Sequence, residues 1–163
     1  VEAIEAEFKL FPADGFAPKI ATINLGMIRT HADGIKFMGC VRVPPTVTEE
    51  IYERWMAFLR KRCEIEGASF RISEYKQPFA TSKQSLFVAK CQEVAAELGL
   101  SPALGAQALA NEANVFSRLG LECVVFGPGR GVGNSHAPNE HVKINQLEQA
   151  VQFYKTLLNK VCL

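Results

Sequence analysis

Residues 121–143 read LECVVFGPGRGVGNSHAPNEHVK, and this stretch decides the fold that we expect for the second half of the chain. It opens with an apolar run from Cys123 to Phe126, bounded by turn residues, which is typical of a short strand buried on both faces. Turn-forming residues then follow within seven positions: Gly127, Pro128, Gly129, Gly131 and Gly133. Regular structure is expected to stop there, and glycine lets the backbone approach a ligand closely.

His136 stands at the end of that expected loop. In an open α/β sheet, ligands bind beyond the carboxyl ends of the strands, where a loop leaving a buried strand delivers its side chains. An imidazole in that place can bind a metal ion or transfer a proton. The residues alone leave this role open against that of a histidine in a surface loop.

Helices are expected on both sides of this stretch. Helical spacing predicts a helix over 85–98, a shorter one that Asn111 can cap, and a last one near Asn145 and Glu148, which resemble a capping box. The apolar residues expected on buried faces are Phe87, Cys91, Val94 and Leu98 in the first helix and Leu147, Val151, Tyr154, Leu158 and Val161 in the last. With a small-residue strand at 103–109, this order predicts the closing βαβα part of a parallel α/β sheet.

The first half of the chain predicts an α+β layer. Asp33-Gly34 between two alternating segments is a hairpin signal, and Thr48 can cap the helix that follows Pro44-Pro45. The expected elements are, in order, a helix at 1–11, strands at 20–28 and 35–43, a helix at 48–63 and a strand at 68–75. This order predicts an antiparallel sheet with two helices on one face, and it is incomplete because such a unit normally opens with one more strand.

A change of composition at residues 77–82, with a proline and small polar residues, indicates a domain boundary. We therefore expect one domain at 1–77 and a second at 78–163. The chain begins at Val1, without an initiator methionine and within a helical pattern, so we expect it to be a piece of a longer protein.

Composition excludes several partners. The net charge is +1, from 18 basic and 17 acidic residues that are interspersed, which argues against a nucleic-acid or membrane surface as the main partner. No apolar run approaches the roughly 20 residues that a membrane helix needs. Five scattered cysteines, odd in number and never spaced as C-x-x-C, indicate reduced thiols in a cytoplasmic protein.

The residues from Phe126 to Gly129 and from Ser135 to Glu140, FGPG and SHAPNE, carry a resemblance to a known family. They are similar to the closing segment of the co-catalytic zinc hydrolases, which include acetylornithine deacetylase, acetyl-lysine deacetylase, succinyl-diaminopimelate desuccinylase, aminoacylase and related carboxypeptidases. The similarity covers nearly the whole chain, although only this segment is specific. The resemblance implies a catalytic α/β domain interrupted by an inserted α+β lid that often mediates dimerisation. Residues 1–77 then look like the lid without its first strand, and 78–163 like the C-terminal portion of the catalytic domain.

The resemblance also implies roles for individual residues. His136 matches a ligand of one of two zinc ions, and Arg42 matches a lid arginine that binds the carboxylate of the substrate, against the alternative of a plain surface charge. Asn111 matches a turn near the substrate, although a role as a helix cap alone is the simpler interpretation. Gly127 and Gly129 would line the cleft. In the family, the other metal ligands and the glutamate that acts as general base come from sequence not present here, so we expect no catalytic residue in this chain and no tight zinc binding by it alone.

Two functions follow as hypotheses. The first is a fragment of a zinc-dependent amidohydrolase or peptidase that removes an acyl or aminoacyl group from an N-acyl amino acid or small peptide through metal-activated water, and that dimerises through the lid. The alternative is a non-catalytic dimerisation or interaction module derived from that family.

Overall fold

The computed structural model describes residues 2–108 and 110–162, which form two compact units. Unit 1 covers Val1–Ala80 and Gly105–Leu121, and unit 2 covers Thr81–Leu104 and Glu122–Leu163. The expected start of the first helix at Val1 and the expected end of a strand at Leu109 lie outside the described residues. Within those residues, no helix is long and apolar enough to cross a bilayer.

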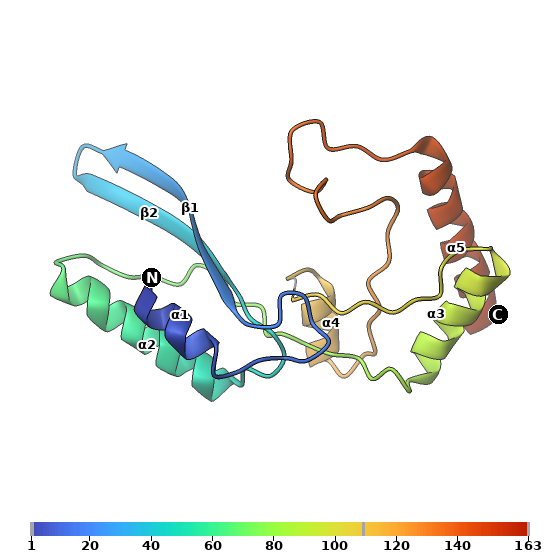
Figure 1. Ribbon diagram of the computed structural model, residues 1–163, viewed down its shortest axis with the longest axis horizontal. Coiled ribbons are helices and arrows are strands. Elements are labelled where there is room, and N and C mark those ends of the chain that lie inside the picture. The colour runs from blue at the N-terminus through green and yellow to red at the C-terminus, as the bar shows by residue number, and fades with distance from the viewer. Residues whose placement is uncertain (1, 109, 163) are drawn as a thin grey trace. The chain divides into compact units, whose positions relative to one another are not determined.

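A long hairpin forms the sheet of unit 1 (Figure 1). Strand β1 (Thr22–His31) pairs with β2 (Gly34–Arg42) in antiparallel register. His31 is opposite Gly34, so Ala32 and Asp33 form the turn, and the hairpin predicted from Asp33-Gly34 is confirmed. The register shifts between Leu25 and Met27, which marks a β-bulge.

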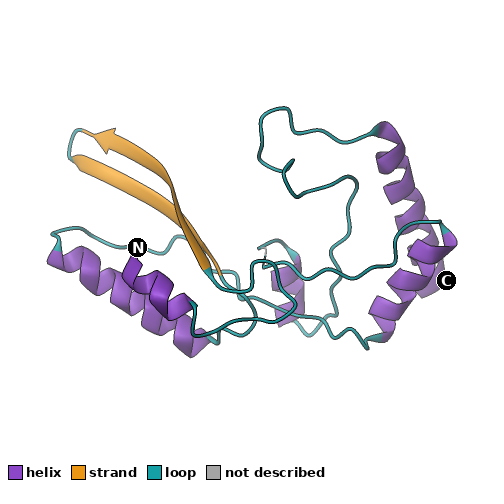
Figure 2. Ribbon diagram, viewed as in Figure 1, coloured by secondary structure: helices purple, strands orange, loops and turns teal. Residues whose placement is uncertain are grey.

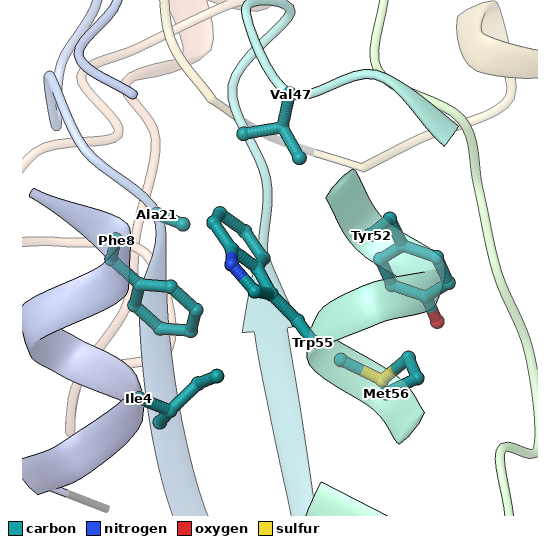
Figure 3. Close-up of a cluster of buried hydrophobic side chains, with 7 residues drawn as sticks. All are labelled: Ile4, Phe8, Ala21, Val47, Tyr52, Trp55 and Met56. Atoms are coloured by element: carbon teal, nitrogen blue, oxygen red, sulfur yellow. The ribbon is translucent and has the colours of Figure 1, made fainter. Parts of the chain in front are cut away.

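Two helices pack on the base of this hairpin and form the core of unit 1. Helix α1 (Glu2–Phe8) and helix α2 (Glu49–Ile65) contribute buried side chains, and Thr48 caps α2 as expected by accepting a hydrogen bond from the backbone N–H of Ile51 at 3.3 Å. Figure 3 shows Trp55 with the α1 side chains on one side and Tyr52 and Met56 on the other. The buried cluster consists of Ile4, Phe8, Ala21, Val47, Tyr52, Trp55 and Met56.

The segment 68–75 does not form the strand that its alternation predicts. Phe70 and Ile72 pack on the core of unit 1 as expected, and Arg71 is exposed, but the residues between 68 and 75 belong to no sheet. A strand requires a hydrogen-bonded neighbour, whereas here side chains hold the segment: the ring of Tyr75 stacks on Tyr52 with centroids 3.9 Å apart. Burial raises the pKa of both phenols.

Unit 2 is built on the packing of helix α3 (Leu86–Glu97) against helix α5 (Ile144–Cys162). Ser85 caps α3 by accepting hydrogen bonds from the backbone N–H groups of Phe87 and Val88 at 3.1 and 3.3 Å. The core of unit 2 consists of Cys91, Val94, Ala95 and Phe153. The buried face of α3 is therefore predicted correctly at Cys91 and Val94.

The predicted face of α5 is wrong. Helix α5 uses Ala150 and Phe153 as its buried residues, with Leu157 beside them, while the five apolar residues expected to be buried are 44–57% exposed. Since this helix carries apolar residues on two faces, periodicity does not distinguish the face that meets α3. The capping box expected at Asn145 is also wrong, because α5 begins at Ile144 and Asn145 lies within the helix. Instead, the side chain of Gln146 accepts a hydrogen bond from the backbone N–H of Lys143 at 3.2 Å.

An ionic cluster joins α3 and α5 at the surface. The Lys160 ammonium lies 2.7 Å from carboxylate oxygens of both Glu93 and Glu97, and Lys90 lies 2.7 Å from Glu93. Hydrogen bonds from Lys160 and Lys90 lower the pKa of Glu93 to about 2. The hydrogen bond to Glu93 is in turn the main cause that raises the pKa of Lys160.

The segment from Cys123 to Phe126 is not the buried strand that we expected. Figure 2 draws the whole stretch between α4 (Ala113–Arg118) and α5 as loop, and Val125 is 62% exposed. Side chains hold the segment: the Thr81 hydroxyl donates to the Cys123 carbonyl at 2.6 Å, and Phe126 stacks on Phe153 at 3.9 Å. A buried parallel strand needs strands beside it, and the sheet in the described part of the chain contains only β1 and β2. The fold is therefore mixed α/β with an antiparallel sheet. The predicted parallel sheet is not confirmed: within the described ranges, the strand expected at 103–109 makes one isolated parallel bridge, from Gln107 to Ala17.

Candidate functional site

The loop that carries His136, defined here as the His136 loop (residues 131–141), consists of successive turns. Ser135 donates its backbone N–H to the carbonyl of Gly131 at 2.8 Å, and Ala137 donates to Asn134 at 3.2 Å. Glu140 then donates its backbone N–H to the carbonyl of Ala137 at 3.1 Å. The loop is thus folded on itself.

Two side chains add hydrogen bonds across the His136 loop. The Asn134 amide donates to the carbonyl of His141 at 2.8 Å and accepts from the backbone N–H of His141 at 3.2 Å. A carboxylate oxygen of Glu140 accepts a hydrogen bond from the backbone N–H of His136 at 3.0 Å. Sequence reasoning missed the roles of both residues, although an asparagine in a glycine-rich loop is a known signal for hydrogen bonds from the side chain to the backbone of a turn.

His136 has a left-handed backbone, with φ of 60°, and Asn139 has φ of 62°. A left-handed residue other than glycine costs roughly 1–3 kcal/mol, so the surrounding hydrogen bonds must hold it. The side chain of His136 is exposed, and within the described residues its ring makes no hydrogen bond. The His141 ring differs, because its Nδ1 lies 2.9 Å from the carbonyl of Asn139.

The side chains near His136 can supply one of the ligands of a zinc site, the His136 imidazole itself. A free imidazole nitrogen is a usual zinc ligand, and a catalytic zinc needs about three protein ligands. Among residues 2–108 and 110–162, no three His, Cys, Asp or Glu side chains are grouped closely enough to hold a metal ion. Cys123 is a poor substitute, since burial raises the pKa of its thiol.

Gly127 and Gly129 precede the His136 loop in unit 2. Gly129 has φ of 83°, and a Cβ built on it would lie 3.2 Å from the Cγ2 of Val142. Close packing and backbone conformation therefore already account for a glycine at 129. A Cβ on Gly127 would meet no atom within 4 Å. Substrate binding by either glycine stays a prediction.

Arg42 is the last residue of β2, in unit 1, where it pairs with Thr22. The side chain is exposed, and it takes part in no ion pair of the described structure. A guanidinium that is in no ion pair can bind a carboxylate through two parallel hydrogen bonds, in bidentate geometry. Its predicted role in substrate binding is compatible with this exposure and stays a prediction.

Asn111 lies two residues before the first residue of the short helix α4, in unit 1. Its side-chain oxygen accepts from the backbone N–H of Ala113 at 2.9 Å, and its own N–H donates to the side chain of Asn114 at 2.8 Å. Asn114 is only 2% exposed, and its amide also donates to the carbonyl of Gln77 at 2.8 Å. The side chain of Asn111 thus bonds the first turn of α4, although the N-cap residue of that helix is Glu112. Contact of Asn111 with substrate stays a prediction.

Two shallow pockets lie elsewhere. The first, of about 540 Å³, is in unit 2 and is lined by Leu98 and by side chains of α5. The second, of about 340 Å³, is in unit 1 and is lined by residues 77–80 and by side chains of α4. Neither is lined by His136, Arg42 or Asn111. The predicted site residues are therefore placed in open loops and at a strand end.

Comparison with known proteins agrees with the resemblance noted in the sequence. The chain is similar to allantoate amidohydrolase of Bacillus subtilis (strain 168), with 29% identity over 115 residues. That alignment covers 71% of this chain and 28% of the relative, so the chain spans well under half of the length of that protein. The model of peptidase family M20/M25/M40 matches residues 3–160, nearly the whole chain. The predicted relationship is thereby confirmed, and the chain belongs to peptidase family M20/M25/M40.

Proposed function

We propose that this chain is part of a metal-dependent amidohydrolase or peptidase that hydrolyses the amide bond of an N-acyl amino acid or small peptide. Membership in a peptidase family supports a hydrolase, and the similar protein of Bacillus subtilis is named an amidohydrolase. The observation that carries the proposal is the exposed imidazole of His136, presented by a hydrogen-bonded loop in the segment that matches the family.

His136 would contribute one zinc ligand through a neutral ring nitrogen. Zinc supplies a Lewis acid that makes water nucleophilic at neutral pH and polarises a carbonyl group. We infer that the remaining ligands, a second metal ion and the general base come from sequence outside residues 1–163, and the greater length of the relative supports this inference. In this chain, Arg42 would bind the carboxylate of the substrate, and Asn111, Gly127 and Gly129 would contribute to the walls of the cleft.

We further propose a homodimer through the hairpin of unit 1. Apolar side chains on its outer part are exposed: Leu25 53%, Ile28 64%, Ile35 62% and Phe37 60%. Exposed apolar patches of this kind mark protein interfaces. The same observation favours the second candidate, a dimerisation module without catalysis. A cytoplasmic location is supported by the five cysteines, which are odd in number, scattered and never spaced as C-x-x-C.

The experiment that tests the hydrolase uses the complete protein and a panel of N-acyl amino acids and dipeptides with added zinc. His136→Ala is expected to lose bound zinc and nearly all hydrolysis while its circular dichroism stays unchanged. His141→Ala is the matched control, since it removes a nearby imidazole with no assigned role. Dimerisation without zinc binding or turnover in the parent protein would favour the module instead.

A further inference from the structure

We propose that Glu140 and Asn134 are positioning residues that hold the His136 loop in the shape that presents the imidazole to its metal ion. This inference rests on the proposed ligand role of His136. It assigns no metal contact to Glu140 or Asn134, and both act through the backbone of the loop.

Glu140 acts on the residue that carries the imidazole. Its carboxylate accepts the backbone N–H of His136 at 3.0 Å, and that residue has φ of 60°. An ionised acceptor makes a stronger hydrogen bond than a neutral one, which offsets part of the cost of a left-handed residue. Because φ sets the direction of the Cα–Cβ bond, releasing this bond lets the imidazole point elsewhere.

Asn134 acts at the other end of the loop. Its amide makes two hydrogen bonds to the backbone of His141, at 2.8 and 3.2 Å, and so joins residues seven positions apart. His141 adjoins Glu140, so this pair of bonds also places the Glu140 carboxylate. The two side chains therefore act in series, with Asn134 fixing residue 141 and Glu140 fixing residue 136.

The contacts distinguish positioning from general stabilisation. Asn134 is half-buried, His136 and Glu140 are exposed, and none of the three belongs to the core clusters of either unit. Removal of these hydrogen bonds should therefore leave the fold intact and change only the way in which the ring is presented. Partners that orient a metal ligand typically contribute 10–100-fold to metal affinity.

The test measures zinc affinity of the complete protein by competition with a chromophoric chelator, without any substrate. The variants are His136→Ala, Glu140→Ala, Glu140→Gln, Asn134→Ala and Asn134→Asp, with His141→Ala as the control. Melting temperature and circular dichroism of each variant report the fold separately.

We expect Glu140→Ala and Asn134→Ala to weaken zinc binding by roughly 10–100-fold at an unchanged melting temperature. Glu140→Gln should recover most of the affinity, because the glutamine carbonyl can also accept the N–H of His136. Asn134→Asp should not recover it, because a carboxylate cannot donate to the His141 carbonyl.

Three results would overturn the proposal. If Glu140→Ala binds zinc like the parent while His136→Ala does not, the positioning role fails and the ligand role stands. If Glu140→Gln is as weak as Glu140→Ala, the carboxylate acts through its charge or as a direct ligand rather than as an acceptor. If His136→Ala keeps full affinity, the proposed function itself fails.

Discussion

The indole ring of Trp55 lies against the ring of Phe8, with centroids 4.6 Å apart and planes tilted by 56°. This contact joins α2 to α1, and Trp55 is only 1% exposed. Truncation of a buried aromatic side chain removes its apolar contacts and leaves a cavity.

Trp55→Ala is therefore expected to destabilise unit 1 by about 3–5 kcal/mol. The measurement is urea denaturation followed by far-ultraviolet circular dichroism. Phe58→Ala on the same helix is the control, since Phe58 is 40% exposed and should cost less than about 1 kcal/mol. Equal losses from the two variants would contradict the core described here.

Stability of the contact between α3 and α5 should fall in acid. Lys160 and Lys90 hold the pKa of Glu93 at about 2, below the value of about 4.3 expected in an unfolded chain. A lowered carboxyl pKa contributes stability that is present above the unfolded value and is lost as pH falls from about 4.3 to about 2. Because Glu93 is a surface group, added salt should weaken the effect.

Melting temperature measured from pH 6 to pH 2 tests this dependence. The parent should lose more stability across the window from pH 4.3 to pH 2 than Glu93→Gln, which has no carboxylate to protonate. Glu148→Gln, which removes another exposed carboxylate from unit 2, should follow the parent. Parallel curves for the parent and Glu93→Gln would show that the ionic cluster does not contribute.

Gly39→Ala should disturb the hairpin at its bulge. A Cβ at this position would lie 2.9 Å from the Asn24 carbonyl oxygen and 2.9 Å from the Cδ2 of Leu25, so the backbone of β1 would have to move. Such overpacking costs about 1–3 kcal/mol. Gly26→Ala is the control within the same bulge, because its nearest atom is the Asn24 side-chain nitrogen at 3.4 Å. A urea midpoint that shifts no more for Gly39→Ala than for Gly26→Ala would contradict the observed register.

Asn114→Ala should loosen the connection that follows residue 76. The buried amide bonds both the Gln77 carbonyl and the Asn111 backbone N–H, and its loss leaves these groups without their partner. Each unsatisfied group costs about 1–3 kcal/mol. Limited proteolysis should cut near residues 77–80 faster in this variant. Asn159→Ala, an exposed change in α5, should keep the cleavage rate of the parent.

Elements set by local chemistry could be predicted, while those set by distant partners could not. The Thr48 cap and the Asp33-Gly34 hairpin depend on a few neighbouring residues, and both are observed. Residues 68–75 and 123–126 have the composition of strands, but strand formation also depends on a sheet beside the segment, and in the described residues the sheet consists of β1 and β2 alone.

The candidate site was predictable only in part. His136 could be singled out from its motif, but its left-handed backbone and its bond to Glu140 could not, because periodicity does not choose hydrogen-bond partners within a loop. The same reason applies to α5, where the pattern shows two apolar faces and only packing against α3 selects Phe153.

Two exposed cysteines have a practical consequence. Cys40 on β2 and Cys162 on α5 are exposed, one in each unit, whereas Cys91 is buried and its thiol has a raised pKa. Thiol-reactive dyes should therefore modify the two outer sulfurs first. Once the half-buried Cys63 and Cys123 are replaced by serine, a donor and an acceptor fluorophore can be attached at Cys40 and Cys162. Förster resonance energy transfer between them would then measure the distance between unit 1 and unit 2.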